Sequence, residues 1–279
     1  MLRTATAIIA LLAAAPALAQ SAGDTALPNP NDQSDTFTVA LGAAFIPDYE
    51  GSNDHEGTPF AAIRGRVNGM SFSTRGTYLY LDLVRRPESG IDFDAGPIVG
   101  VRRERTGKVK DDFVTDLPER DTAIEIGGFA GVTFHGLTNP YDQLSLRLDV
   151  LSDVGGAHKS TIFIPTIDFG TPLSRRTYIG ASLSAEFVAD RYADYYYSIS
   201  PAEGLVAGLP SYDADGGMKN WKLSALVNQS ITGDLTGGFS IFGAATYSHI
   251  VGDIADSPIV DDRGSTSQWQ GVLGLAYTF

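Results

Sequence analysis

Large apolar residues alternate with small or polar residues along much of this chain, and this period of two is the feature that most constrains its fold. The clearest segment is 143–150, where Leu144, Leu146, Leu148 and Val150 alternate with Gln143, Ser145, Arg147 and Asp149. The segment 269–279 repeats the pattern up to a terminal aromatic residue, Phe279. Successive side chains of a β-strand point to opposite faces, so each such segment is predicted to be a strand with one apolar and one polar face. An apolar face in lipid and a polar face in a wet interior are typical of a transmembrane β-barrel.

The alternating segments predict an all-β protein, an antiparallel up-and-down barrel of about twelve strands that forms one domain over residues 36–279. Bacterial single-chain barrels have even strand numbers, so ten and fourteen are the alternatives. Residues 70–75 and 78–84 form either one bent strand or two, and Asn68 and Gly69 predict a two-residue hairpin before them. Residues 195–197, three tyrosines, are assigned to a further strand as girdle and packing aromatics, with a sugar-binding platform as the alternative. Residues 103–121 and 201–217 are predicted to be long loops on the outer side of the membrane.

Charged residues in the alternating segments fall on the face opposite the apolar one. The positions predicted to face the lumen are Arg64, Arg66, Asp92, Asp94, Arg102, Arg147, Asp149 and Glu186. An Arg or Lys on the lipid face near the midplane costs about 2–4 kcal/mol, which explains this segregation. Inside the barrel these charges are expected to form an ion-pair ladder that plugs and rigidifies the lumen, and the alternative is a path that selects a solute. A soluble β-sandwich would show the same alternation, but segments of about ten residues or more favour the barrel.

The beginning of the chain has the features of an export signal. Arg3 precedes an apolar run over residues 4–15, and Ala17 and Ala19 form a small-x-small cleavage site, so residues 1–19 are predicted to be a signal peptide. Residues 20–35 are polar and contain two prolines, which predicts a flexible lead-in. The absence of cysteine excludes disulfides, thiolate metal sites and a lipid-anchored cysteine. A formal net charge of −13 disfavours nucleic acid as a partner, because nucleic-acid binding needs a basic surface.

The sequence contains no recognisable catalytic motif. There is no Gly-x-Ser-x-Gly elbow, zinc-binding His-Glu-x-x-His helix or phosphate-binding loop, and the four histidines lie far apart. The acidic segment 48–56 has oxygen ligands that suit a hard cation, but it lacks the spacing of a calcium loop and reads first as a surface loop. We therefore expect no catalytic residues, no cofactor and no metal site.

The beginning of the barrel domain resembles the MipA/OmpV family of outer-membrane proteins, the MltA-interacting proteins. The family pattern is an apolar strand followed by Pro-x-Tyr-x-Gly and then Ser or Ala, which maps onto Pro47, Tyr49, Gly51 and Ser52. The segments 59–60, 64–65 and 271–279 are also similar to the family. The resemblance implies an outer-membrane barrel that acts as a scaffold between a membrane-bound lytic transglycosylase and a murein synthase. No catalytic residues come with the family, and the four motif residues are expected to form a structural turn.

Three functions follow as hypotheses. The first is a non-enzymatic scaffold in the outer membrane, whose periplasmic turns contact murein enzymes. The alternative is a narrow channel or transporter for small solutes or drugs, and the third hypothesis is an outer-membrane hydrolase. The expected partners also include outer-membrane lipid and the barrel-assembly machinery, which is expected to recognise Phe279.

Overall fold

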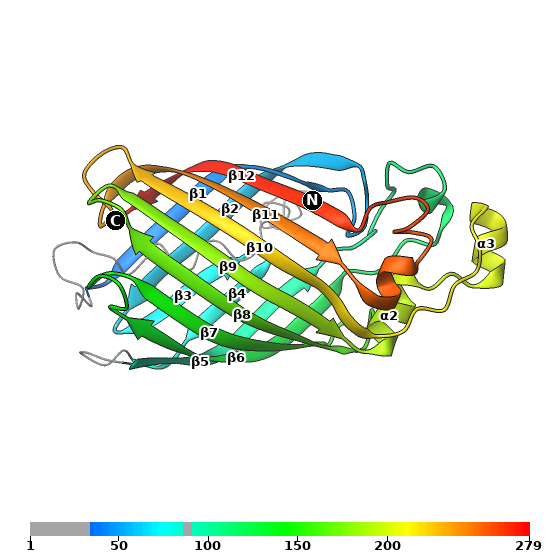
Figure 1. Cartoon of the computed structure of the whole chain (residues 1–279), viewed down its shortest axis with the longest axis horizontal. Helices are drawn as coiled ribbons and strands as arrows, with labels where there is room; N and C mark the ends of the chain where they lie inside the picture. Colours follow the sequence, from blue (N-terminus) through cyan, green and yellow to red (C-terminus); the bar gives the residue numbers. More distant parts are fainter. Residues whose placement is uncertain (1–33, 86–90) are drawn as a thin grey trace, which may run out of the picture.

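The computed structural model describes residues 34–85 and 91–279, and these residues form a closed antiparallel barrel of twelve strands. Each strand pairs with its neighbours in sequence, and β1 pairs with β12 to close the barrel (Figure 1). The strands are β1 Thr36–Pro47, β2 His55–Val67, β3 Met70–Arg75, β4 Tyr78–Asp82, β5 Ile91–Arg102, β6 Ala123–His135, β7 Gln143–Asp153, β8 Thr161–Pro172, β9 Thr177–Val188, β10 Gly217–Ser230, β11 Gly238–Ile250 and β12 Ser267–Thr278. The predicted fold class and strand number are confirmed.

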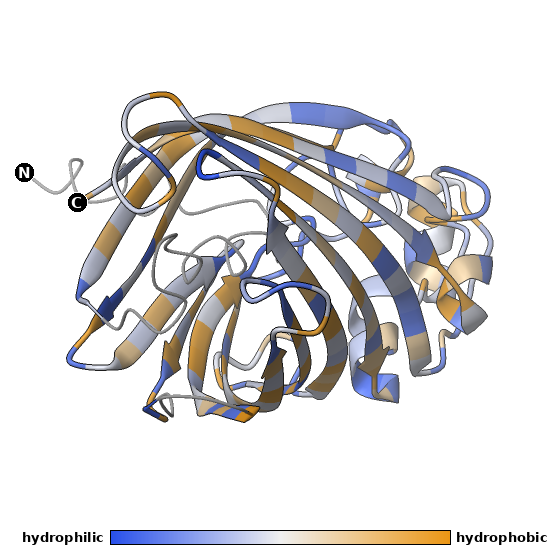
Figure 2. Ribbon diagram, turned by 60° about the vertical axis from the view of Figure 1, so that its left-hand side comes forward, coloured by the Kyte–Doolittle hydropathy of each residue, from blue (hydrophilic) through white to orange (hydrophobic). Residues whose placement is uncertain are grey.

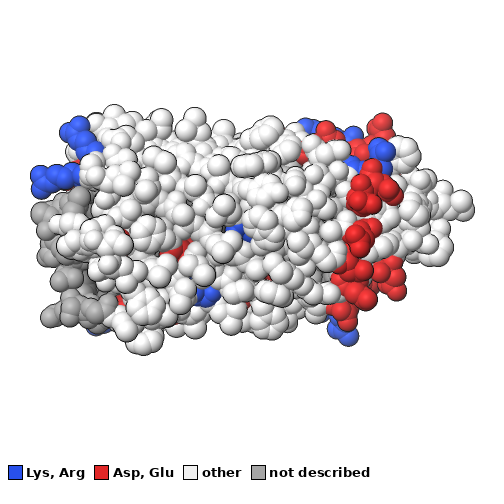
Figure 3. Space-filling model, viewed as in Figure 1, with Lys and Arg blue, Asp and Glu red and all other residues white. Residues whose placement is uncertain are grey.

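The alternation of the sequence becomes an outside and an inside. On β7, Leu146 and Leu148 are 40% and 44% exposed, whereas Arg147 and Asp149 between and beside them are 6% and 1% exposed. Figure 2 shows the same alternation as bands along the strands. Figure 3 shows few charged side chains over the middle of one face, whereas acidic side chains gather near the end that carries α2. The barrel therefore presents an apolar belt of the kind that faces lipid.

The connections differ in length between the two ends of the barrel. The long connections 103–122, 189–216 and 251–266 all lie at one end, which we call the loop end (Figure 1). The opposite end, the turn end, carries the short turns and the end of β12 at Thr278. One of these turns joins β2 and β3, where Asn68 and Gly69 have φ of 54° and 80°, so the predicted hairpin is confirmed. The region 70–84 forms two short strands rather than one bent strand.

The assignment of residues 195–197 to a strand is wrong. They end the helix α2, Asp190–Tyr197, in which Tyr192, Tyr196 and Tyr197 are buried. Tyr192 and Tyr196 are four residues apart, so they share one face of the helix and pack inward under the loops. These tyrosines belong to the core at the loop end and are not a lipid-facing girdle.

Three long loops contain helices that the strand pattern did not indicate. α3, Pro201–Ala207, lies within the predicted loop 201–217, and its Ser200 and Glu203 form a capping box. The short helices η2, Val114–Asp116, and η3, Gly252–Asp256, lie in the loops 103–122 and 251–266. The predicted signal peptide at 1–19 and nearly all of the predicted lead-in at 20–35 lie outside the described residues. In the described part of the chain, no helix has the length and apolar character needed to cross a membrane.

Candidate functional site

The interior of the barrel holds two clusters of charged side chains. The middle cluster consists of Arg75, Tyr80, Arg147, Asp149 and Asp168. Arg147 lies 2.6 Å from Asp149 and 3.4 Å from Asp168, and Arg75 lies 3.3 Å from Asp168. The hydroxyl of Tyr80 donates to Asp149 at 2.9 Å, and the guanidinium of Arg75 lies 5.2 Å from the ring centroid of Tyr80. Two arginines thus balance two aspartates in a buried site, as buried charges require.

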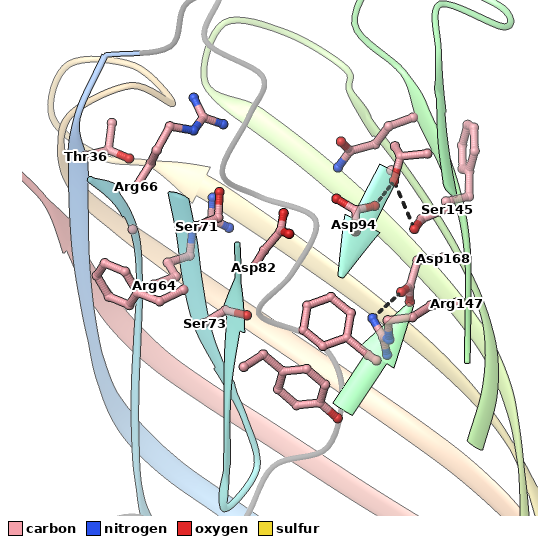
Figure 4. Close-up of a pocket in the computed structure, with 18 residues that line it drawn as sticks. Thr36, Arg64, Arg66, Ser71, Ser73, Asp82, Asp94, Ser145, Arg147 and Asp168 are labelled. Atoms are coloured by element: carbon pink, nitrogen blue, oxygen red, sulfur yellow. Dashed lines mark hydrogen bonds and ion pairs between the residues drawn. The ribbon is translucent and has the colours of Figure 1, made fainter. Parts of the chain in front are cut away.

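These contacts cross the lumen. Arg75 is on β3 and Asp168 is on β8, and four strands separate them around the barrel wall. Tyr80 on β4 likewise reaches Asp149 on β7. Figure 4 shows Arg147 and Asp168 joined inside the barrel. Because side chains from distant strands meet here, the lumen is filled at this level by paired charges.

The upper cluster lies nearer the loop end and consists of Glu50, Arg102, Glu125, Glu186, Lys219 and Lys222. The Nζ of Lys219 lies 2.7 Å from Glu50 and 2.8 Å from Glu186, and Lys222 lies 3.2 Å from Glu186. Arg102 on β5 lies 2.8 Å from Glu125 and reaches Glu186 on β9 at 3.2 Å. Three carboxylates therefore meet three cations, and the cluster has no formal excess charge.

Packed loops cover the upper cluster. Tyr192 of α2 accepts a hydrogen bond from Lys219 at 3.0 Å, and its ring edge contacts the buried His158. His158 lies 3.0 Å from Glu125, so it ties the connection 154–160 to the same cluster. α2, η3 and the strand ends form one apolar core that contains Ile98, Ile162, Val188, Tyr196, Ile250 and Ile254. A packed apolar core therefore lies over the upper cluster at the loop end.

The four family-motif residues join the first loop to the last. Pro47 ends β1, and the buried Tyr49 donates its hydroxyl to the carbonyl of Ile259 at 3.2 Å. Gly51 has a φ of 108°, and a Cβ there would lie 2.8 Å from Val260. Ser52 is 1% exposed and forms a β-bridge with Gly264. Burial raises the pKa of Tyr49, which keeps its hydroxyl protonated as a donor.

The remaining predicted lumen residues lie nearer the turn end. Arg64, Arg66 and Asp94 line a cavity of about 110 Å³ (Figure 4), and Asp94 accepts a hydrogen bond from Thr133 at 2.7 Å. Asp92 is 1% exposed and lies 4.0 Å from His135, so it is not part of either cluster. Arg102, Arg147, Asp149 and Glu186 belong to the clusters described above.

Sequence reasoning missed several members of the clusters. Glu125 lies between two lipid-facing isoleucines, and Lys222 follows an outward Trp221. The alternation of inward and outward positions along each strand was therefore sufficient to find both. Lys219 lies where the register between β9 and β10 shifts. Such a bulge changes the direction of a side chain, so the regular alternation would assign Lys219 to the wrong face. Glu50 is in a loop and carries no periodic signal.

The chemistry of the site is that of paired charge. Among the described residues no group of three or more His, Asp or Glu side chains is arranged to hold a metal ion. In the acidic segment 48–56, Asp48 accepts from the backbone N–H of Lys110 at 2.7 Å and Glu50 pairs with Lys219. Of the described histidines, none is hydrogen-bonded to a serine or threonine hydroxyl, the arrangement that activates a hydroxyl nucleophile.

A larger cavity of about 760 Å³ lies between the loops and the middle cluster. Its lining includes Pro59 of β2, Tyr78 of β4, Glu186 of β9 and Lys222 of β10. A third cavity, of about 90 Å³, is more apolar and is lined by Phe60, Phe242 and small residues of β1, β2 and β12.

Comparison with known proteins places these features in a family. The sequence model described as "MltA-interacting protein MipA" matches residues 39–279. The MltA-interacting protein of Escherichia coli (strain K12) is 26% identical over 99 residues, which cover 35% of this chain and 36% of that protein. The MltA-interacting protein of Shigella flexneri matches to the same extent, so the chain spans about a third of the length of the curated relatives it matches.

Solved structures with a similar shape are outer-membrane proteins. The NanC porin has a TM-score of 0.45 and 8% identity, with 87% of this chain and 98% of that chain covered. An outer membrane channel from Pseudomonas putida F1 has a TM-score of 0.46 and 10% identity, with 92% and 98% covered.

Proposed function

The chain belongs to the MltA-interacting protein family and is an outer-membrane β-barrel protein, and on this premise we propose that it is a non-enzymatic scaffold that binds murein-processing enzymes through its periplasmic turns. The partners would be a lytic transglycosylase and a murein synthase, as the family resemblance implies. The observation that carries the scaffold role is the set of ion pairs that cross the lumen between β3 and β8 and between β5 and β9. A barrel filled in this way has its working surface at its ends.

The turn end has the composition of a contact surface. Leu137, Leu173 and Ile231 are 54%, 63% and 52% exposed in three of its turns. Arg175 and Arg176 are exposed in the same turn as Leu173. Exposed apolar patches mark protein or membrane interaction sites, and arginine is enriched at protein interfaces, which supports a periplasmic partner at this end.

A pull-down tests the scaffold role. The folded protein in detergent is expected to retain a lytic transglycosylase or a murein synthase from a periplasmic extract. Leu173→Asp together with Arg175→Glu should abolish this retention, since both changes fall on the turn end. The matched control is Leu205→Asp on α3, because Leu205 is 87% exposed at the opposite end. Equal retention by all three proteins, or no retention of a murein enzyme by the unchanged protein, would overturn the proposal.

The cavity of about 760 Å³ favours the alternative, a narrow channel or transporter for small solutes. Planar-bilayer recordings separate the two functions. A scaffold with a filled lumen should give no regular conductance steps. Robust conductance steps would refute the closed scaffold and support the channel.

The route to the outer membrane is part of the same proposal. Cleavage after Ala19 would remove the signal peptide at residues 1–19 and leave the lead-in at residues 20–35 attached to the barrel. Assembly by the barrel-assembly machinery would follow, with Phe279 as its signal. N-terminal sequencing of the protein from outer-membrane fractions is expected to begin at Gln20, and an intact Met1 would contradict this route.

A further inference from the structure

The barrel wall is incomplete on one side. β3 and β4 contain six and five residues, whereas their neighbours β2 and β5 contain 13 and 12. β2 pairs with β1 along its length, but it pairs with β3 only over Arg64–Val67. Residues 55–62 of β2 thus have no strand on that side in the described part of the chain. At about 3.3 Å per residue, this edge is about 25 Å long.

The unpaired edge is one border of an opening that we call the wall window. Its other borders are residues 75–78 at the tip of the β3–β4 hairpin, residues 101–102 at the end of β5, and the segment 103–110. That segment crosses to the far border, where the backbone N–H of Lys110 donates to Asp48 at 2.7 Å and its ammonium group donates to the carbonyl of His55. The window is therefore framed on all sides by described residues.

The window lies at the level of the apolar belt. Across the β1–β2 pair, Ala61 is opposite Leu41 and Gly57 is opposite Phe45. Leu41 and Phe45 are 57% and 55% exposed on the outer surface. In hydrocarbon each unsatisfied backbone group is costly, so an open edge at this depth needs a reason.

Pro59 shows how this edge is adapted. The N–H of Ile63 points toward β3, where it donates to the hydroxyl of Thr74 at 3.0 Å. Backbone groups of a strand alternate in direction, so the group at position 59 points into the window. Proline has no N–H and is found on edge strands for this reason. The proline therefore removes one donor from the edge at the centre of the opening.

The large cavity connects the window to the far wall. The same space of about 760 Å³ is lined by Thr58, Pro59 and Tyr78 at the window and by Ser184 and Glu186 of β9 on the other side. A molecule that enters between β2 and the hairpin thus reaches the interior without passing through the packed loop end.

The charge on the frame selects the kind of molecule. Arg103 and Lys108 are exposed, line the cavity, and make no hydrogen bond or ion pair to an acidic side chain of the described residues. By contrast, Glu186 and Lys222 deeper in the cavity are paired with each other. The exposed Glu56 lines the same cavity from the β2 border, so the unpaired cations are concentrated on the segment 103–110. Two cations on that segment, beside an apolar border, fit a molecule with an anionic head and an apolar tail.

We propose that the wall window is a lateral portal through which a small amphipathic anion, with a carboxylate or phosphate head, passes between the outer leaflet and the large cavity, its head held by Arg103 and Lys108. The proposal goes beyond the scaffold function and does not depend on a murein partner.

The absence of cysteine allows a direct test. Ser184→Cys places a single thiol on the inner side of the cavity. The full-length protein in phospholipid vesicles is treated with a long-chain alkanoic acid that carries a terminal maleimide and dissolves in the membrane. A short-chain maleimido acid that stays in water serves as the second probe. We expect the long-chain probe to label the thiol more than about tenfold faster than the short-chain probe, equal to at least 1.4 kcal/mol in barrier.

Two further variants test the window and the head site. Thr58→Trp, whose side chain lines the cavity at the border, should slow the long-chain probe more than about tenfold. Ala130→Trp on the outward face of β6 is the control and should not change it. Arg103→Glu with Lys108→Glu should slow the acid probe about tenfold but leave its methyl ester unchanged. Should Thr58→Trp fail to fold, Gly107→Trp tests the opposite border, because a Cβ at Gly107 meets no atom within 4 Å.

The outcomes separate the possible sources of the ligand. Faster labelling by the short-chain probe would mean that the cavity fills from water and would overturn the portal. Unchanged labelling in both tryptophan variants would also overturn it. Equal slowing of the acid and its ester by the charge reversal would overturn the anionic head site.

Discussion

Lys219 is the side chain whose removal should best reveal whether the upper cluster holds the barrel together. It is fully buried, and its ammonium lies 2.7 Å from Glu50, 2.8 Å from Glu186 and 3.0 Å from the Tyr192 hydroxyl. It therefore joins the first loop, β9 and helix α2 at one point. Lys219→Met keeps a long apolar stem but leaves the cluster with two cations against three carboxylates.

The expected cost follows from this imbalance. Removing one partner of a buried ion pair costs about 3–5 kcal/mol, because the other partner stays buried without compensation. Glu186 keeps Lys222 at 3.2 Å and Arg102 at 3.2 Å, so we expect the lower end of that range, about 3 kcal/mol. For a urea dependence of about 3 kcal/mol/M, the unfolding midpoint falls by about 1 M.

Urea unfolding in detergent micelles, followed by tryptophan fluorescence, measures this change. Lys219→Met combined with Glu186→Gln restores the charge balance and should recover more than half of the loss, which a double-mutant cycle quantifies. Lys108→Met is the matched control, since Lys108 is exposed and has no acidic partner among the described residues, and it should change the free energy of unfolding by less than about 0.5 kcal/mol. A loss below about 1 kcal/mol for Lys219→Met, typical of an exposed ion pair, would refute the reasoning.

Three further predictions concern the turn end and the wall. Burial opposes the ionisation of Asp142, but hydrogen bonds from the Thr138 hydroxyl and from turn N–H groups hold its pKa below its usual value. The stabilisation by Asp142 is thus present above about pH 4 and is lost as the pH falls through the folded-state pKa. Asp142→Asn should lower the free energy of unfolding by about 2 kcal/mol at neutral pH, measured by urea titration, and should flatten its pH dependence on the acid side. Gly127→Val should prevent barrel formation, because a Cβ at this position would lie 1.9 Å from the carbonyl oxygen of Val150. Heat-modifiable gel mobility measures barrel formation, and mobility equal to that of the unchanged protein would contradict the prediction. The N–H of Phe279 donates to the carbonyl of Phe37 at 2.9 Å. Deletion of Phe279 should reduce assembly in the outer membrane more than export across the inner membrane, measured by cell fractionation. Insertion of the truncated chain to the same extent as the full chain would count against this prediction.

The alternation of apolar and polar residues was sufficient to assign side chains to the two faces of the wall wherever a strand is regular. It separated Leu146 and Leu148 from Arg147 and Asp149, and it accounts for the strand number and the antiparallel order. It failed where the backbone leaves that period. The tyrosines at 195–197 belong to the helix α2. The capping residues Ser200 and Glu203 were a local signal of α3, which the assignment of residues 201–217 to a loop did not use.

The candidate site could be predicted only in part. The charged side chains on regular strands could be assigned to the lumen, but their partners could not be identified from spacing. Arg75 and Asp168 are 93 residues apart, and Glu50 and Lys219 are 169 apart. Which of these meet depends on the stagger between strands, on the bulge near Lys219 and on loop packing, none of which has a sequence period.

The sequence by itself determined that this chain forms a lipid-facing barrel with charges turned inward, because the direction of a side chain on a strand is a local property with a period of two. Only the tertiary structure decided which charges pair across the lumen and that α2 and η3 pack over the loop end. It also decided that the wall is left open beside Pro59. These features depend on where the ends of strands far apart in sequence come to lie, and that position is set by closure of the whole barrel.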